Sequence, residues 1–233
     1  MSPARHFTTF SAEHVATIGV IFLLALGLVI IGRSRSLAHL VRPVSWALCV
    51  LAVGHEAAWV IGAMILGHWH FSWGVPLQLC DLAIFAVALT LIRHYQWVWE
   101  LAYFWGLGGS LQAILTPDLN VTFPHLIYIK FFLSHGCTVA GVIFLAAGLR
   151  RPIYFKSVLR VFCITNIYGL FVLGINWLLG TNYMYLMHKP SRPSLLDYAG
   201  SGPYYYLGLE AALIVSLLFY YLPYYFVSYR KTK

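Results

Sequence analysis

The stretch HVATIGVIFLLALGLVIIG, from His14 to Gly32, decides the fold of this protein. It runs for 19 residues without a Lys, Arg, Asp or Glu. Because an α-helix rises about 1.5 Å per residue, this length crosses most of the roughly 30 Å of hydrocarbon in a bilayer. No small-residue cleavage site follows it before the next charged loop, so we interpret it as a spanning helix and not as a signal peptide.

Apolar stretches of similar length recur along the whole chain. Of its 233 residues 61% are hydrophobic and only 9% are charged, whereas a soluble domain has about 25% charged residues. The sequence therefore predicts an all-α membrane protein, a single domain over residues 1–233 that forms one bundle of seven transmembrane helices. The predicted spans are residues 14–32, 44–66, 75–92, 97–115, 127–148, 158–179 and 204–225.

Lys and Arg are distributed unequally between the two sides of this predicted bundle. Four of the 15 belong to one side, namely Arg5, Lys130, Lys189 and Arg192. The positive-inside rule therefore predicts an external N-terminus and a cytoplasmic C-terminus. Orientation also accounts for the net charge of +8, so we predict no nucleic-acid partner. The eleven on the cytoplasmic side are Arg33, Arg35, Arg42, Arg93, Arg150, Arg151, Lys156, Arg160, Arg230, Lys231 and Lys233.

Polar side chains inside the predicted spans gather in the outer half of the membrane. Ionisable groups are costly there, so each is a candidate for function. Cys80 and Asp81 are expected about 9 Å below the outer end of their helix and His135 about 12 Å below the end of its own. Other helices add polar groups near this depth: His55, Glu56, Gln112, Asn176 and Glu210.

Glu100 is the exception to this pattern. It is expected one turn inside the cytoplasmic end of its helix, where a neighbouring cation such as Arg93 would pair with it.

Cys80 and His135 together have the components of an acyl-transfer nucleophile. A buried thiol stays protonated unless a base takes its proton, and an imidazole can do so. Asp81, Glu210 or Asn176 could orient the imidazole. Amide donors could stabilise an oxyanion, and the candidates are Gln78, Asn176 and Asn182. This chemistry requires no metal and no cofactor.

The depth of these groups suggests the substrate. The ester carbonyl of a glycerophospholipid lies at the boundary between headgroup and acyl chain, so we predict phospholipid and lysophospholipid as partners. The residues expected to line the substrate site are Asn182 and Tyr183 in the long outer loop, together with Gln112 and His55.

Several motifs carry a resemblance to a known family. They are SAEH (11–14), PLQLCD (76–81), ELAYFWGL (100–107), QAILTPDL (112–119), FFLSHG (131–136) and INWLLGTNYMYL (175–186). The sequence resembles the YwaF-like family of bacterial integral membrane proteins, whose eukaryotic relatives are transmembrane acyltransferases implicated in making ether phospholipids. The resemblance implies a cysteine nucleophile at Cys80, a histidine partner at His135 and a multi-pass protein of the bacterial cytoplasmic membrane. Gln78 departs from it, because histidine is expected there.

Two other classes of function use the same residues. In a proton-coupled small-solute or lipid transporter, Asp81, Glu210, His55 and His135 would form a pathway through the membrane. We find no internal repeat of the kind common in transporters. In a membrane metallohydrolase, Cys80, Asp81, His55 and His135 would be zinc ligands.

Overall fold

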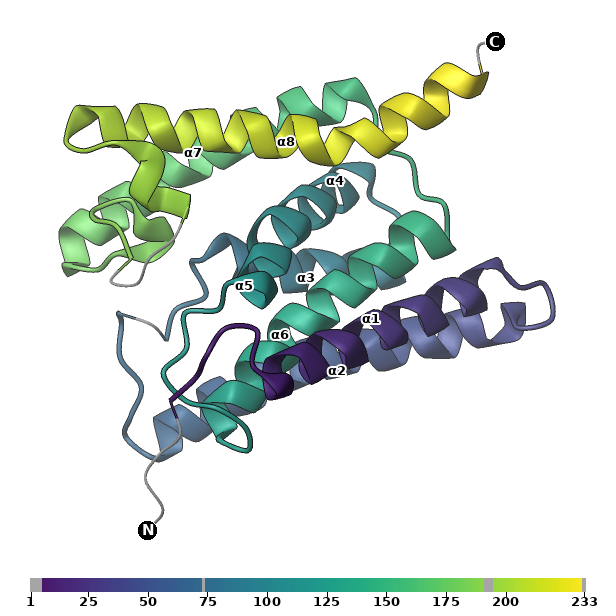
Figure 1. Ribbon diagram of the computed structural model, residues 1–233, viewed down its shortest axis with the longest axis horizontal. Coiled ribbons are helices and arrows are strands. Elements are labelled where there is room, and N and C mark those ends of the chain that lie inside the picture. The colour runs from purple at the N-terminus through teal and green to yellow at the C-terminus, as the bar shows by residue number, and fades with distance from the viewer. Residues whose placement is uncertain (1–5, 73, 191–194, 232–233) are drawn as a thin grey trace.

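The computed structural model describes residues 6–72, 74–190 and 195–231, and these are almost entirely helical (Figure 1). Within these ranges the strand-like pairing is a single bridge between His6 and Val121. The all-α prediction is therefore confirmed. Arg5, Arg192 and Lys233, which entered the prediction of orientation, lie outside the described residues.

The helices follow the predicted apolar stretches to within a few residues at most boundaries. Their bounds are α1 Ala12–Arg33, α2 Val41–Ile65, α3 Leu79–Ile92, α4 Gln96–Trp105, α5 Gln112–Leu115, α6 Leu126–Ile143, α7 Phe155–Leu179 and α8 Pro203–Lys231. A π-helical segment, η2 (Gly106–Leu111), joins α4 to α5, and a second, η3 (Phe144–Gly148), continues α6.

Among the described residues, five helical stretches are long and apolar enough to cross a membrane, which makes this a multi-pass membrane protein. They are Ala12–Arg33, Ala38–Ile65, Leu126–Gly148, Phe155–Leu179 and Pro203–Val227. The helix α3 is apolar but only 14 residues long.

The predicted start of the third span, residue 75, is wrong. Helix α3 begins at Leu79, because Gln78 has extended backbone angles (φ −71°, ψ 149°) and acts as the N-cap. The Gln78 N–H donates to Asp81 Oδ2 at 3.2 Å, which satisfies a backbone group at the helix start. Pro76, two residues earlier, also disfavours helical backbone before it. Cys80 therefore lies in the first turn of α3 and not about six residues below its outer end.

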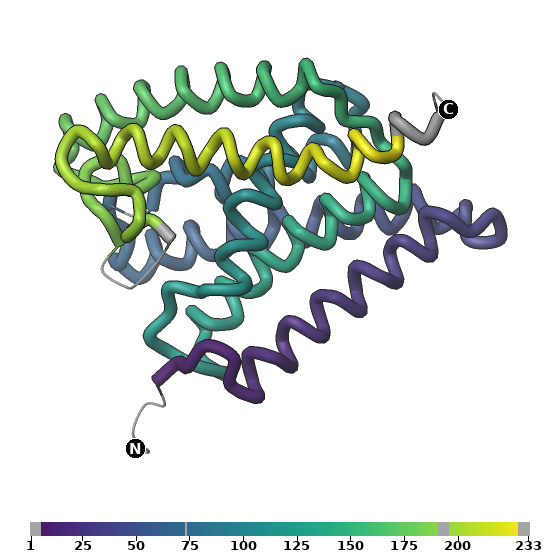
Figure 2. The backbone as a smooth tube through the Cα atoms, turned by 45° about the horizontal axis from the view of Figure 1, so that its top comes forward, coloured from purple at the N-terminus to yellow at the C-terminus, as the bar shows by residue number. Residues whose placement is uncertain are grey.

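Helix α6 lies at the centre of the bundle. Figures 1 and 2 show α7 and α8 paired on one side of the bundle and α1 on the other, with α3, α4 and α6 between them. Helix α1 packs on α6, and α2 packs on α3 and α6. In the membrane-length window of α6, 67% of residues are buried, against 6% in α1. The core accordingly consists mainly of side chains from α3, α4, α6 and η3, with a few from α7 and α8, and Trp99, Val142 and Phe144 are among its most buried members.

Glu100 pairs with a different cation from the one predicted. Its fully buried carboxylate lies 2.7 Å from Arg160 Nη1 on α7, so Arg93 is not its partner. Ser157 Oγ also donates to Glu100 Oε1 at 2.8 Å. The expectation failed because sequence distance within one loop does not reveal which neighbouring helix packs against α4. This pair joins α4 to α7 at the end of the bundle that holds most of the basic residues.

We expect Arg160→Met to destabilise the protein by about 2 kcal/mol, because it leaves the Glu100 carboxylate buried without its charged partner. Thermal unfolding in detergent micelles measures this. The double variant Glu100→Gln/Arg160→Met should recover part of the loss, since no unpaired charge remains. A double variant less stable than the sum of both single changes would contradict this account.

Candidate functional site

The π-helical segment η2 packs against both helices that carry the predicted catalytic residues. A Cβ added to Gly109 would lie 3.6 Å from Cys80 Cβ on α3. A Cβ added to Gly106 would lie 2.9 Å from Val142 and 3.2 Å from Thr138 on α6. The segments η2 and α6 run in opposite directions. Three residues after Gly106 on η2 is Gly109, and three residues before Thr138 on α6 is His135, so Gly109 and His135 lie at the same level. Gly109 therefore lies at the level of both Cys80 and His135.

The packing of α3 on α6 gives the same register independently. A Cβ added to Gly141 would lie 2.5 Å from Val87 Cγ1, so these two residues meet where the helices approach closely. Both helices run in the same direction. Asp81 is six residues before Val87 and His135 is six residues before Gly141, a rise of about 9 Å on each helix, so Asp81 and His135 lie at the same level. The matched depth of Cys80, Asp81 and His135 predicted from sequence thus agrees with two separate helix contacts.

The position of Cys80 at a helix start offsets part of the cost that burial and the neighbouring Asp81 impose on a negative charge at its sulfur. It is the second residue of α3, and the backbone N–H groups of Cys80 and Asp81 face the sulfur. The N-terminus of a helix carries a partial positive charge, which stabilises thiolates. Asp81 was expected to orient an imidazole, but one of its oxygens caps Gln78 instead.

His135 and Ser110 each bury a polar atom that has no hydrogen-bond partner in the described part of the chain. These atoms are His135 Nδ1 and Ser110 Oγ. His135 is 9% exposed, its ring packs edge-on against Phe131 at 4.5 Å, and Ser110 is fully buried within η2. Nearly all buried polar groups in proteins are paired, so an unpaired one needs an explanation. Here both lie at the level of Cys80, and π-helical turns often mark functional sites.

The sequence did not predict the charged network that lies on α2 and α6 near His135. Glu56 on α2 lies 3.2 Å from Lys130 Nζ, accepts a 2.5 Å hydrogen bond from Ser134 Oγ and lies 3.2 Å from His55 Nε2. Lys130 lies in the second turn of α6. The spacing of Lys130 and Ser134, four residues apart on one helix face, was the available signal.

Asn176 anchors the outer loop, and its amide is occupied there. Its side chain donates to Tyr183 O at 2.9 Å and accepts from Thr181 Oγ1 and the Tyr183 N–H, both at 2.8 Å. Asn182 likewise bonds within its own loop, to Met187 and His188. The expectation that either amide stabilises an oxyanion is therefore not supported by their contacts.

Tyr183 and Gln78 tie this loop to the segment before α3. The Tyr183 hydroxyl donates to Phe71 O and accepts from the Val75 N–H. Gln78 Oε1 accepts from the Met184 N–H at 2.8 Å. Tyr183 is 2% exposed, so it holds the loop rather than lining an open surface.

Two consecutive residues of the outer loop have strained backbone angles. Met184 and Tyr185 have φ of 58° and 54°, in the left-handed region that bulky residues rarely adopt. Tyr185 lies close enough to Cys80 to interact with it electrostatically, and Tyr205 Oη donates to its carbonyl at 2.8 Å. Burial raises the pKa of Tyr185, so its phenol is neutral at physiological pH. Strain of this kind is common in segments that close over sites.

Two predicted site residues make their hydrogen bonds away from Cys80 and His135. Glu210 on α8 accepts from Asn166 Nδ2 at 3.2 Å, in the contact between α7 and α8. Gln112 bonds within its own helix end, donating to Thr116 Oγ1 at 2.8 Å.

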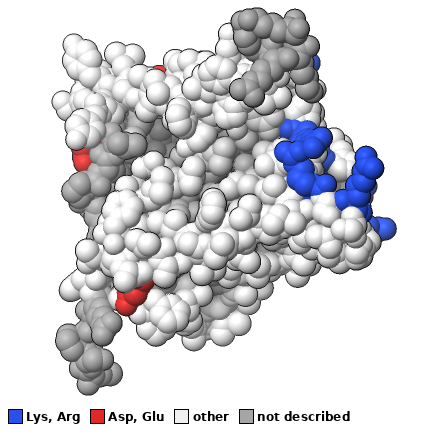
Figure 3. Space-filling view, turned by 45° about the vertical axis from the view of Figure 1, so that its right-hand side comes forward, with Lys and Arg blue, Asp and Glu red and all other residues white. Residues whose placement is uncertain are grey.

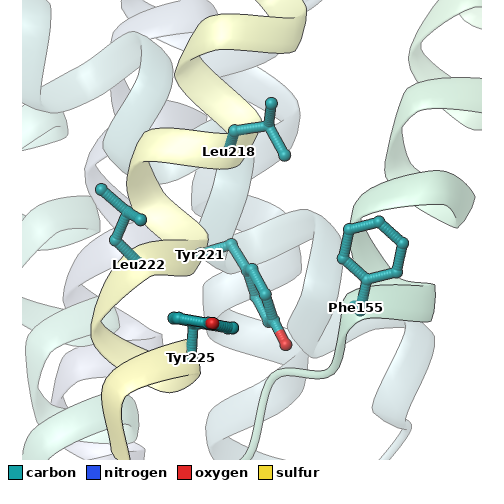
Figure 4. A pocket seen from close by; sticks show the side chains of 5 residues that line it. All are labelled: Phe155, Leu218, Tyr221, Leu222 and Tyr225. Atoms are coloured by element: carbon teal, nitrogen blue, oxygen red, sulfur yellow. The ribbon is translucent and has the colours of Figure 1, made fainter.

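The structure also bears on the other two classes of site. Among the described residues no group of three His, Cys, Asp or Glu side chains is arranged to hold a metal ion. A groove of about 490 Å³ lies between the start of α7 and α8, far along the bundle from Cys80 (Figure 4). Its lining offers no carboxylate, thiol or imidazole and consists of Phe155, Leu218, Tyr221, Leu222 and Tyr225.

The fold and site define a multi-pass α-helical membrane protein with polar groups buried within its bundle. More narrowly, the chain belongs to the TMEM164 family, whose sequence model matches residues 9–221. This confirms the relation to the eukaryotic proteins indicated by the motifs. The chain is also 30% identical over 229 residues to an uncharacterized protein of Treponema pallidum (strain Nichols), covering 94% of this chain and 90% of that one. No solved structure matches it. Membership of this family is consistent with a membrane lipid-related function.

We expect Asn176→Leu to loosen the outer loop, because it removes three hydrogen bonds to Thr181 and Tyr183. The loss of stability should be about 2 kcal/mol, and limited proteolysis should cut within residues 181–190. Asn166→Leu is the matched control, because that asparagine lies on the same helix but does not contact the loop. Equal proteolysis of both variants would show that Asn176 does not anchor the loop.

Proposed function

We propose that this protein is a membrane-embedded acyltransferase that moves a fatty acyl chain between a phospholipid and a lysophospholipid. Cys80 is the nucleophile and His135 the base, and no cofactor takes part. The observation that carries this proposal is the common level of the two residues at η2, with a buried imidazole nitrogen that has no partner. The family match supports a lipid substrate.

The reaction proceeds through a thioester. His135 takes the proton from the Cys80 thiol, and the sulfur attacks the carbonyl carbon of a phospholipid ester. The C–O bond breaks, and His135 returns the proton to the departing glycerol oxygen, which yields a lysophospholipid and S-acyl Cys80. The hydroxyl of an acceptor lysophospholipid then attacks the thioester while His135 takes its proton. The thiolate leaves and is reprotonated by His135.

The start of α3 supplies the oxyanion donors in this proposal. The first N–H groups of a helix have no intrahelical partner, and Leu79 and Cys80 provide two of them, whereas the Asp81 N–H donates to the Gln78 side chain. These backbone groups take the role that was expected of the Asn176 and Asn182 amides, because those amides are hydrogen-bonded to the outer loop. Backbone donors at a helix start stabilise the charge that develops on the carbonyl oxygen.

The position of Cys80 favours an ester at the membrane interface over one in the aqueous phase. The thiol lies in the first turn of an apolar helix, next to loops that carry the aromatic side chains Trp69 and Tyr183. Aromatic and polar residues gather at this depth of membrane proteins, where lipid ester groups also lie. Many large apolar side chains of α1, α7 and α8 are exposed and would contact the acyl chains of neighbouring lipids.

We expect Cys80→Ala and His135→Ala each to abolish acyl transfer, with the double variant costing little more, because residues that act as one unit are non-additive. Turnover with a labelled phospholipid and intact-protein mass spectrometry, which detects acyl addition at Cys80, measure this. The control variant Cys137→Ala removes a different thiol, on α6, and should keep full turnover. Turnover that survives Cys80→Ala would refute the covalent mechanism and favour a transport or metal-dependent function.

We also propose that the chain crosses the membrane seven times, with the N-terminus outside and the C-terminus in the cytoplasm. The stretch from α4 through η2 to α5 is continuously helical from Gln96 to Leu115, which is long enough to span. The 14 residues of α3 rise about 21 Å, and the extended residues before it add to that length. On the face in Figure 3, Lys and Arg gather at one end of the molecule and the acidic residues lie toward the other.

Reporter tags test this topology. A tag placed after Lys233 should report the cytoplasm, and one inserted between Met187 and Lys189 should report the exterior, because α8 separates the two positions. Both tags on the same side would contradict a membrane-spanning α8, and both reversed would contradict the orientation.

A further inference from the structure

Ser110 carries a buried hydroxyl that its own helix does not satisfy. Its side chain is 0% exposed, and its Oγ has no hydrogen-bond partner in the described part of the chain. The buried hydroxyls of Ser45 and Thr90 both donate to the carbonyl four residues earlier in their helices, at 2.8 and 2.7 Å. An unpaired buried hydroxyl is unfavourable, so the position of Ser110 requires a reason outside η2.

Ser110 lies on the surface of η2 that faces α6. A Cβ added to Gly106 would lie 2.9 Å from Val142 and 3.2 Å from Thr138, so Gly106 marks where the two segments touch. Ser110 follows Gly106 by four residues, which is about one helical turn, and therefore lies on the same side of η2. On α6, His135, Thr138 and Val142 share one face because they are three and four residues apart. Since the two segments run in opposite directions, Ser110 and His135 lie at the same level on surfaces that face each other.

The imidazole of His135 lacks a partner at this same level. Its Nδ1 is buried and has no hydrogen bond among the described residues. The base of a nucleophile pair is usually oriented by a third group, which also fixes its tautomer. The groups expected from the sequence to do this are hydrogen-bonded elsewhere, Asp81 at the start of α3, Glu210 to α7 and Asn176 to the outer loop. An unpaired hydroxyl and an unpaired ring nitrogen thus lie level with each other on facing helix surfaces.

We propose that Ser110 is the positioning residue for His135, whose Nδ1–H donates to the Ser110 hydroxyl when the ring takes the proton of Cys80. This inference rests on the function proposed above. With one hydrogen held at Nδ1, the other nitrogen, Nε2, is free to accept the thiol proton. The ring is then an imidazolium, and hydrogen bonds from a charged donor are stronger than those from a neutral one. Ser110 acts only through His135 and does not touch the sulfur or the lipid ester.

The charge on the ring decides when this hydrogen bond forms. Ser110 Oγ and His135 Nδ1 are not bonded to each other in this structure, and hydrogen bonds between catalytic groups are often long before the reaction begins. A neutral imidazole has one N–H group, but an imidazolium has two, and each needs an acceptor. The Ser110 hydroxyl can rotate to meet Nδ1, because no other hydrogen bond holds it. Gly109, the preceding residue, is the one whose Cβ would lie 3.6 Å from Cys80 Cβ, so the same turn of η2 contacts the nucleophile.

The test measures how fast Cys80 reacts with iodoacetamide, without any lipid, in a protein whose Cys49, Cys137 and Cys163 are changed to Ala. At neutral pH the thiolate depends on His135, so Ser110→Ala should slow alkylation about tenfold, which corresponds to one lost hydrogen bond. At alkaline pH the thiol ionises without the imidazole, so the rates of the parent protein and Ser110→Ala should converge. A general packing defect would instead slow the reaction at every pH.

A double-variant cycle tests whether Ser110 acts through the ring. His135→Ala should slow the neutral reaction at least as much as Ser110→Ala does. The double variant Ser110→Ala/His135→Ala should be no slower than His135→Ala alone, because residues that act as one unit are non-additive. Ser45→Ala is the matched control, since it removes a buried serine hydroxyl that bonds within α2, and it should leave the rate unchanged.

Three results would overturn the inference: a parental rate in Ser110→Ala, slowing that persists at alkaline pH, or slowing that adds to that of His135→Ala. A parental rate in His135→Ala would refute the proposed base and the inference together. Turnover that survives Cys80→Ala, with the expected slowing of alkylation by Ser110→Ala, would refute the proposed function and leave the pairing of Ser110 with His135 in place.

Discussion

The close approach of η2 to α3 and α6 is the contact on which the candidate site depends. The contact of η2 with α6 requires glycine, since a Cβ on Gly106 would lie 2.9 Å from Val142. The contact of α6 with α3 does too, since a Cβ on Gly141 would lie 2.5 Å from Val87. Packed interiors do not yield to such overlap without moving a helix. Because η2 is a π-helical turn, it shifts the face that α4 and α5 present to the bundle. That shift brings Gly109 against Cys80 on one side and Ser110 into the core on the other.

The buried polar groups divide into two kinds by their contacts. Glu100, Asn176 and His14 are fully buried and hydrogen-bonded, with His14 donating to Ile114 O at 2.7 Å, so each stabilises a contact between distant segments. In the described part of the chain, His135 Nδ1 and Ser110 Oγ are buried without such partners, and His55 Nε2 lies 3.2 Å from Glu56 but makes no hydrogen bond. An unpaired buried polar group is unfavourable unless a ligand provides its hydrogen-bond partner. The unpaired groups therefore mark the candidate site, and the hydrogen-bonded groups stabilise the fold around it.

Helix rise predicted the common level of the candidate residues better than it predicted their contacts. Cys80, Asp81 and His135 share one depth because helix rise converts sequence position into height. The roles of Asn176, Asn182 and Tyr183 could not be predicted, because each bonds within or between loops whose path no periodicity specifies. Glu210 has the right depth but meets Asn166 on α7, since depth says nothing about which way a side chain points around its helix.

The sequence by itself determined that this is a multi-pass helical membrane protein of the TMEM164 family, since hydrophobic length and motif are properties of the chain alone. The sequence did not predict where α3 begins. The largely apolar stretch continues through residues 75–78, but the hydrogen bond from the Gln78 N–H to Asp81 starts the helix after Gln78. Only the tertiary structure decided which charges meet. Glu56 and Lys130 are 74 residues apart in a chain of 233, and Glu100 and Arg160 are 60 apart. Their pairing follows from the helices that α6 and α4 happen to touch, and that packing depends on the whole set of helix surfaces at once.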